Sequence, residues 1–217
     1  MPRTYPFAPQ MLPYPCYGLT PGLQADGVYL HHSVLYSGDI VALNALLAQY
    51  PDAQGLTLSA LLTDPLPSVR TVDRARIRHL AGSLFSHELY FAGLCPQGAA
   101  SPQGALRAAI LARYGSLEAF KSLVRQAAGD ILGVGFVWLN TDAAGNIHLA
   151  ITNDYRTPQL NLFTPVLVLD AWEHAYFSPY YTGLDAYVES WFSLLNWREA
   201  ERRYNAATAL GRPSGSS

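Results

Sequence analysis

The sequence predicts an α+β fold: an N-terminal helical hairpin domain followed by a C-terminal α/β domain with a small antiparallel sheet. Helices are indicated because apolar residues recur at intervals of three and four, from about Asp26 to Gln49 and again from about Val72 to Gly93. A sheet is indicated because this period changes to two after Val134. We expect an N-terminal arm with the hairpin domain (1–96), a C-terminal α/β domain (97–210) and a flexible tail (211–217).

Composition narrows the class of protein. The chain has 217 residues, of which 50% are hydrophobic, so it is long enough to bury a substantial core. A net charge of -2 and a single lysine, Lys121, argue against nucleic acid as a partner. Cys16 and Cys95 form no CxxC pair, which suits a reducing compartment. Because no apolar leader and no run of about 18 apolar residues is present, we expect a cytoplasmic protein without a membrane partner.

The N-terminal half begins with a proline-rich arm over residues 5–22, which we expect to be extended. Asp26 is the expected N-cap of the first helix, and Pro51 follows its end. The face that should turn inward carries Val28, His31, Leu35, Ala42, Ala45 and Leu46. In a regular helix His31, Leu35 and Asp39 would stack on one stripe, because they lie four residues apart.

The second long helix is expected after a short one at Thr57–Leu62 and a turn at Asp64–Pro67. Its buried stripe should consist of Ile77, Leu80, Leu84, His87, Phe91 and Leu94. Ser83 lies one turn before His87 on the same face. Each helix of the hairpin therefore directs one histidine inward.

The C-terminal half should alternate short helices and strands. Pro102 should open a helix that Gly115 closes, and Ser116 should cap the next one. The remaining expected elements are a helix at Leu117–Ala128, a hairpin of Val134–Asn140 with Asn146–Thr152, a buried strand at Pro165–Asp170, and helices at Tyr187–Leu195 and Asn196–Ala209.

The chemistry is concentrated at the end of the buried strand, where Asp170, Trp172, Glu173 and His174 follow one another closely. Burying Asp170 without a partner would cost several kcal/mol, roughly, so a cation or strong donors should meet it. His31, His87, Asp170 and His174 are the four inward polar groups. A single histidine on an apolar face is more often a core residue, but three imidazoles with a carboxylate suit a redox-active iron or manganese ion.

From these residues the chain resembles the iron/manganese superoxide dismutases over about residues 12–205. The run from Asp170 to Tyr176 (DAWEHAY) is similar to the family signature, and His87–Phe91 (HELYF) to its second-ligand helix. Further matching blocks are Leu12–Tyr14, Leu19–Pro21, Gly115–Phe120, Gly135 with Trp138, and Asn196–Trp197 with Glu199.

The resemblance implies one iron or manganese ion per subunit, held by His31, His87, Asp170 and His174, with superoxide as the substrate. It also implies a homodimer in which Glu173 bonds to His174 of the partner subunit. Trp172 and Trp138 would wall the metal pocket, and Tyr176 would lie beside the ligands or the dimer contact.

Around these ligands the sequence departs from the family pattern. The family usually has a channel tyrosine where this chain has Asp39, a histidine where it has Leu35, and a tryptophan where it has Phe136. A glutamine that usually bonds to the coordinated solvent has Ser83 and Tyr155 as its two possible counterparts.

Because of these departures, the candidates for the catalytic roles at the bound solvent and in the channel are Tyr155, Ser83 and Asp39. We hypothesise that the Tyr155 hydroxyl takes over the solvent hydrogen bond and that Asp39 is the polar residue of the channel. Either Asp39 is neutralised, by an arginine for which Arg156 is the candidate or by protonation, or its charge makes substrate access poor; we favour the ion pair. Outer hydrogen bonds tune the acidity of the bound solvent and the metal potential.

The sequence thus predicts a superoxide dismutase that converts superoxide to O2 and H2O2. One alternative is a metal-binding homologue with little dismutase activity, serving as a structural or sensing dimer. Another is a ferrous site that activates O2 or peroxide.

Overall fold

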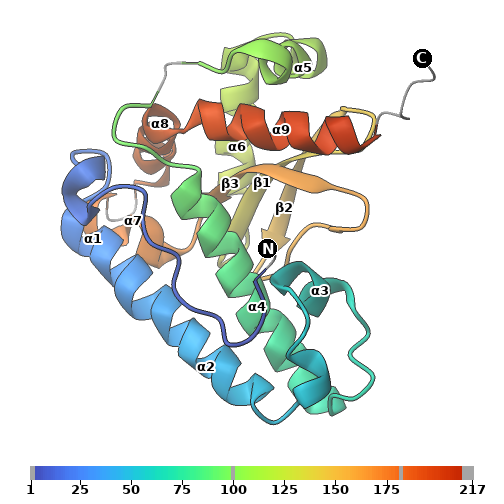
Figure 1. Cartoon of the computed structure of the whole chain (residues 1–217). Coiled ribbons are helices and arrows are strands. Elements are labelled where there is room, and N and C mark those ends of the chain that lie inside the picture. Colours follow the sequence, from blue (N-terminus) through green and yellow to red (C-terminus); the bar gives the residue numbers. More distant parts are fainter. Residues whose placement is uncertain (1–2, 99–100, 181–182, 212–217) are drawn as a thin grey trace.

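The computed structural model describes residues 3–98, 101–180 and 183–211. Its elements in order are a 3-10 turn Cys16–Leu19, α1 Ala25–Tyr29, a π-helical segment Leu30–Tyr36, α2 Ser37–Leu47, a 3-10 turn Pro51–Ala53, α3 Leu58–Thr63, α4 Thr71–Ala92, α5 Gly104–Tyr114, α6 Leu117–Gly129, β1 Gly135–Thr141, β2 Ile147–Asn153, β3 Thr164–Asp170, α7 Glu173–Tyr180, α8 Leu184–Leu194 and α9 Trp197–Gly211. This is the expected α+β fold, with helices first and a small antiparallel sheet in the C-terminal half (Figure 1).

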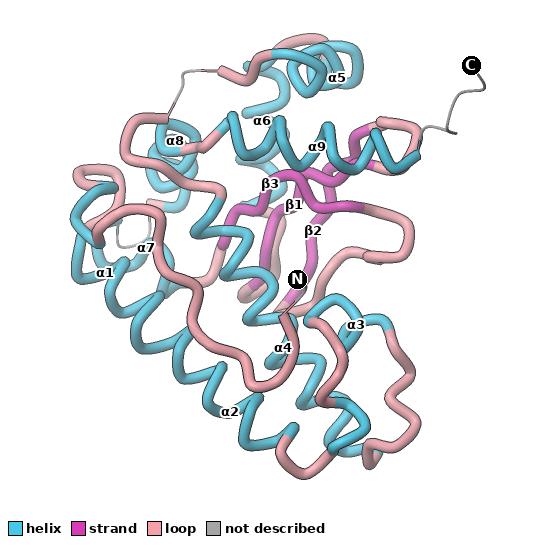
Figure 2. The backbone as a smooth tube through the Cα atoms, in the orientation of Figure 1, coloured by secondary structure: helices cyan, strands magenta, loops and turns pink. Residues whose placement is uncertain are grey.

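The N-terminal half is built around α2 and α4, which pack against each other with α3 against α4. The arm before α1 crosses these helices as an extended chain, as Figure 2 shows. Thr57 caps α3 by accepting a hydrogen bond from the Ala60 N–H (3.1 Å). All six residues of the stripe expected on α4 are buried: Ile77, Leu80, Leu84, His87, Phe91 and Leu94.

The sheet has the order β2-β1-β3 with both pairs antiparallel. Trp138 of the central strand lies opposite Ala150 on one side and Val168 on the other. The β1–β2 turn contains Gly145 at φ 88°, a left-handed conformation that favours glycine. From Pro165 onward every residue of β3 is buried, because α4 and α9 both pack against this strand.

Helix α4 belongs to both halves of the molecule, and this places the site. Its N-terminal part contributes Ile77 and Leu84 to a core shared with α2 and α3. Its C-terminal part contributes Tyr90 and Phe91 to a second core, which includes the sheet. His87 lies between these two sets of residues on α4, and therefore where the two cores meet.

Several expected boundaries are corrected by the structure. The first helix begins at Ala25 after the N-cap Gln24, so Asp26 lies inside its first turn. The helix opened by proline begins only at Gly104, because Gln103 is still extended. Helix α7 was not expected at all, since its sequence shows no clear apolar period.

Other expectations are confirmed or stay open. Ser116 caps α6 by accepting from the Ala119 N–H (3.0 Å), and Asn196 accepts from the Glu199 N–H (3.1 Å) at the start of α9. No helix in the described residues is both long and apolar enough to cross a bilayer. The expected tail covers residues 211–217: Gly211 is the last residue of α9, and residues 212–217 lie outside the described part. The expected domain boundary after residue 96 stays a prediction.

Candidate metal centre

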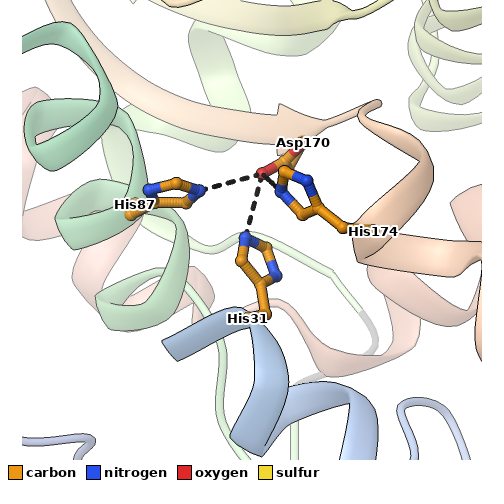
Figure 3. Close-up of side chains that lie close together, drawn as sticks. All are labelled: His31, His87, Asp170 and His174. Carbon is orange, nitrogen blue, oxygen red and sulfur yellow. Dashed lines mark ion pairs between the residues drawn. The ribbon is translucent and has the colours of Figure 1, made fainter. Parts of the chain in front are cut away.

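Four side chains from four elements point toward one another where the two cores meet (Figure 3). They are His31 of the π-helical segment, His87 of α4, Asp170 at the end of β3, and His174 in the first turn of α7. One ligand atom from each lies within 4.8 Å of all the others. Side chains separated by up to 143 positions in sequence (174 − 31) are therefore brought together, as expected from the sequence.

The distances from Asp170 to the three imidazoles match those between ligands of one small cation. Asp170 Oδ2 lies 3.2 Å from His31 Nε2, 3.6 Å from His174 Nε2 and 3.7 Å from His87 Nε2. With bonds to the metal of roughly 2.0–2.2 Å, two ligands about 90–120° apart are separated by about 3–4 Å. An ion at the centre could therefore contact all four atoms.

These four atoms also lack any other partner. Asp170 Oδ2 and the Nε2 atoms of His31, His87 and His174 are all buried without a hydrogen bond among the described residues. Buried polar atoms in folded proteins nearly always have a partner, because desolvation of an unpaired group costs several kcal/mol, roughly. Four such atoms facing one point fit a bound cation.

The ionisation states suit the same ligand. Burial lowers the pKa of His31 and lowers that of His87 well below 6.5, so both imidazoles are neutral and carry a lone pair. Burial alone would raise the pKa of the Asp170 carboxyl, but the imidazoles of His174 and His31 facing it lower that pKa, so the group is a carboxylate. Neutral imidazoles with one carboxylate form a donor set typical of iron and manganese sites.

The backbone around Asp170 aims one oxygen at the centre. Oδ1 accepts the Trp172 N–H (2.9 Å), which leaves Oδ2 free to face the imidazoles. The carbonyl oxygen of Asp170 accepts the Tyr187 hydroxyl (2.8 Å) from α8. Because β3 ends here and α7 begins at Glu173, His174 follows one turn after Asp170 on the same side.

Behind His87 lies a hydrogen-bonded chain that contains two of the expected catalytic residues. Ser83 Oγ lies 3.1 Å from His87 Nδ1 and donates its own hydrogen bond to Asp39 Oδ2. Ser83 is fully buried, whereas Asp39 is partly exposed. The hypothesised ion pair of Asp39 with Arg156 is wrong: no such pair exists among the described residues, because Asp39 is turned to Ser83 and Arg156 is exposed.

Tyr155, the third expected catalytic residue, forms a wall of the site together with Trp172. The two rings stack at 4.4 Å, and Trp172 in turn stacks on His174 at 5.4 Å. Tyr155 also meets the His87 ring at 5.7 Å. Burial raises the pKa of the Tyr155 phenol, and the carboxylates of Asp170 and Asp39 raise it further, so it stays protonated.

A glycine on α4 permits this approach of Tyr155. A Cβ atom on Gly82 would lie 2.0 Å from the Tyr155 carbonyl oxygen, so no other residue fits without a shift.

Trp138 lies one layer further from the four clustered side chains than expected. Its ring contacts Phe136 (5.7 Å) and its Nε1 donates to Thr152 Oγ1 (2.8 Å), while Phe136 contacts Tyr155 (5.9 Å).

The π-helical segment Leu30–Tyr36 changes the face expected for the first helix. Each π turn takes in an additional residue, so Tyr36 is buried one turn after His31 and Leu35 is only partly buried. The Tyr36 ring lies 6.0 Å from that of His87. Sequence reasoning missed Tyr36, although a step of five between the inward residues His31 and Tyr36 marks the change of phase.

Glu173 and Tyr176 lie at the outer edge of the site. Glu173 is exposed at the start of α7. Tyr176 stacks on Tyr187 at 5.4 Å; burial raises its pKa, with the Glu173 carboxylate adding to the effect. Both lie close to His174 in sequence, one before it and one after, and neither belongs to the cluster of four.

Known proteins are similar in sequence to this chain over most of its length. The family model described as iron/manganese superoxide dismutases, C-terminal domain, matches residues 102–203. The chain is 34% identical to superoxide dismutase (Mn) of Thermus aquaticus over 203 residues, covering 94% of this chain and 99% of the relative. It is 32% identical to superoxide dismutase (Mn) of Pseudomonas aeruginosa over 204 residues (94% and 100%), and 32% identical to superoxide dismutase (Mn) 3 of Leptolyngbya boryana over 197 residues (91% and 82%).

Proposed function

The chain belongs to the iron/manganese superoxide dismutase family, and from this we propose that it converts superoxide to O2 and H2O2 with one iron or manganese ion per subunit. We assign His31, His87, Asp170 and His174 as the ligands. The observation that carries the proposal is that their four inward atoms are buried, unpaired and spaced as ligands of one ion.

The reaction needs one redox centre and two protons: 2 O2⁻ + 2 H⁺ gives O2 and H2O2. A bound iron or manganese ion would supply an electron to one superoxide and recover it from another. The protein has to hold the donors in place, exclude bulk water and keep a proton near the substrate. Trp172 and Tyr155 exclude bulk water, since their stacked rings close one side of the site.

Tyr155, Ser83 and Asp39 are the groups that would manage protons and access. The phenol of Tyr155 remains protonated, since burial raises its pKa, so its hydroxyl can donate a hydrogen bond at the site. Ser83 uses its single donor proton on Asp39, so it has none left to donate to the substrate. We therefore assign to Tyr155 the role of donating a hydrogen bond on the substrate side of the site.

We further propose a homodimer in which Glu173 bonds to His174 of the partner subunit. Glu173 is exposed, precedes His174 directly and begins α7, so its carboxylate is accessible to a second subunit. A carboxylate on the outer nitrogen of a metal-ligating histidine fixes its orientation and raises its basicity.

The direct test is metal analysis of the purified protein together with a superoxide assay on iron-loaded and manganese-loaded forms. We expect close to one ion per chain and fast turnover in one form. His87→Ala should abolish both metal retention and turnover. His148→Ala is the matched control, since His148 lies on β2 and is paired with Asp142 (3.5 Å) rather than with the cluster. Equal metal content in the two variants would contradict the ligand assignment.

The second candidate is a metal-binding homologue with little dismutase activity, and one observation favours it. Asp39 carries a carboxylate near the site without an ion pair among the described residues, and an anion there would repel superoxide. Stoichiometric metal with negligible turnover in both metal forms would support this candidate. An oxidised organic product formed from O2 would instead support redirected catalysis.

A further inference from the structure

The hydrogen bonds that link His87, Ser83 and Asp39 all run from donor to acceptor in one direction, and this direction determines which nitrogen of His87 faces the metal site with a lone pair. A serine hydroxyl has one donor proton and two acceptor lone pairs. In the structure that proton is used on Asp39 Oδ2, because an ionised carboxylate can only accept. Ser83 Oγ can then only accept from His87, so the hydrogen atom of their contact belongs to His87 Nδ1 (3.1 Å).

We propose that Asp39, acting through Ser83, is a positioning residue that fixes His87 in the Nδ1–H tautomer and so presents the Nε2 lone pair to the metal. This inference rests on the proposed metal site. It goes beyond ligand assignment, because it gives a role to two residues that do not touch the centre.

Geometry supports the assignment from both ends. His87 is 0% exposed, so bulk water does not reach Nδ1 and Ser83 is its side-chain partner in the described residues. Ser83 is also 0% exposed and precedes His87 by one turn of α4, so the two side chains are held on one face. Asp39 comes from α2, the helix packed against α4, so the tautomer of His87 depends on the packing of these two helices.

The energetic consequence follows from the charge of Asp39. Hydrogen bonds to an ionised acceptor are roughly twice as strong as neutral ones. A Ser83 hydroxyl polarised toward a carboxylate is a better acceptor for the imidazole N–H, which makes Nε2 more basic. A more basic ligand favours the higher oxidation state of the metal. The hydrogen bonds of Asp39 and Ser83 should therefore lower the midpoint potential of the metal.

Three variants test this. Ser83→Ala removes the acceptor of His87, and Asp39→Asn keeps the shape of the side chain but removes its charge. Asp154→Asn is the matched control: Asp154 also raises the pKa of Tyr155 and so acts on the same site through space, but its carboxylate is paired with His79 (3.3 Å). The left-handed φ of 56° at Asp154 is one that asparagine adopts readily.

Two readouts separate positioning from general loss of structure. Affinity for redox-inert Zn²⁺, measured by chelator competition, should fall about 10–100-fold in Ser83→Ala, by less in Asp39→Asn, and not at all in Asp154→Asn. The midpoint potential of the iron-loaded or manganese-loaded protein should rise in Asp39→Asn by more than in Asp154→Asn. A tenfold weaker preference for the oxidised ion corresponds to about 59 mV.

The inference would be overturned by wild-type zinc affinity in Ser83→Ala, or by equal potentials in the two aspartate variants. If Ser83→Ala does not fold, the comparison of Asp39→Asn with Asp154→Asn still decides the question. If the protein shows no dismutase activity, the proposed function fails, yet zinc affinity still reports whether Ser83 and Asp39 support His87.

Discussion

Replacing Gly82 by alanine should destabilise the protein, although the same change in most helices is favourable. Gly82 lies in the interior of α4, where alanine is normally more stable than glycine by about 1 kcal/mol. Here, however, the added Cβ would lie 2.0 Å from the Tyr155 carbonyl oxygen, and such contacts do not occur below about 3.0 Å. The segment that carries Tyr155 must therefore move by at least about 1.0 Å (3.0 − 2.0).

The magnitude follows from what that movement disturbs. Forcing extra volume into a packed region costs about 1–3 kcal/mol. Loss of the Tyr155–Trp172 stack, now at 4.4 Å, costs a further 0.5–1.5 kcal/mol or so. Against the helical gain of about 1 kcal/mol, the net loss in the free energy of unfolding is roughly 0.5–3.5 kcal/mol. Turnover should fall as well, because Tyr155 moves away from His87.

Urea unfolding of the metal-free protein measures this effect, with Gly38→Ala as the matched control. Gly38 lies in α2 with nothing within 4 Å of the added Cβ, so this variant should gain about 1 kcal/mol and keep its activity. The two glycine variants should thus move the unfolding midpoint in opposite directions. A Gly82→Ala protein as stable as Gly38→Ala would refute the close approach of Tyr155 to α4.

Three more outcomes are expected. Tyr155→Phe keeps the ring stack, so it should lower turnover and alter the absorption spectrum of the metal-loaded protein with less than about 1 kcal/mol of destabilisation; an unchanged rate and spectrum would remove Tyr155 from the reaction. Because burial lowers the pKa of His31 and His87 below 6.5, the unfolded chain binds more protons at acid pH, so the metal-free protein should lose stability as pH falls through about 6.5. Urea unfolding at about pH 7.5 and about pH 5.5 checks this sign, and equal free energies would contradict it. Glu173→Ala should weaken the proposed dimer, and an unchanged dissociation constant by sedimentation would argue against that contact.

The sequence was sufficient for most of the fold because periodicity and caps are local signals. The stripe on α4 placed His87 correctly, since 22 residues of regular helix allow no drift of phase. The cap at Ser116 and the glycine of the β1–β2 turn act within a few residues. Helix α7 was missed because its weakly amphipathic sequence gives no such period.

The errors at the site have two physical origins: a local change of helix type, and contacts between elements that spacing along one element does not encode. A regular helix would have placed Leu35 on the stripe of His31, and the π-helical segment puts Tyr36 there instead. Asp39 was expected to pair with a cationic side chain, but it accepts a hydrogen bond from Ser83 on the neighbouring helix α4 instead. The contact of Asp39 with Ser83 depends on how α2 packs against α4, which residue types alone do not determine.

The position of the site also determines what a bound ion would do for the fold. His31 and His87 come from the helical half, and Asp170 and His174 come from the strand end and helix that follow it. Without an ion, the four inward atoms remain buried and unpaired, which opposes packing of the two halves against each other. An ion bound only by the folded chain would remove this opposition and stabilise the fold by RT ln(1 + [L]/Kd), about 4.1 kcal/mol at 1,000 times Kd. Metal should therefore raise the unfolding midpoint of the whole chain, and a metal-independent midpoint would show that the four atoms do not converge on an ion.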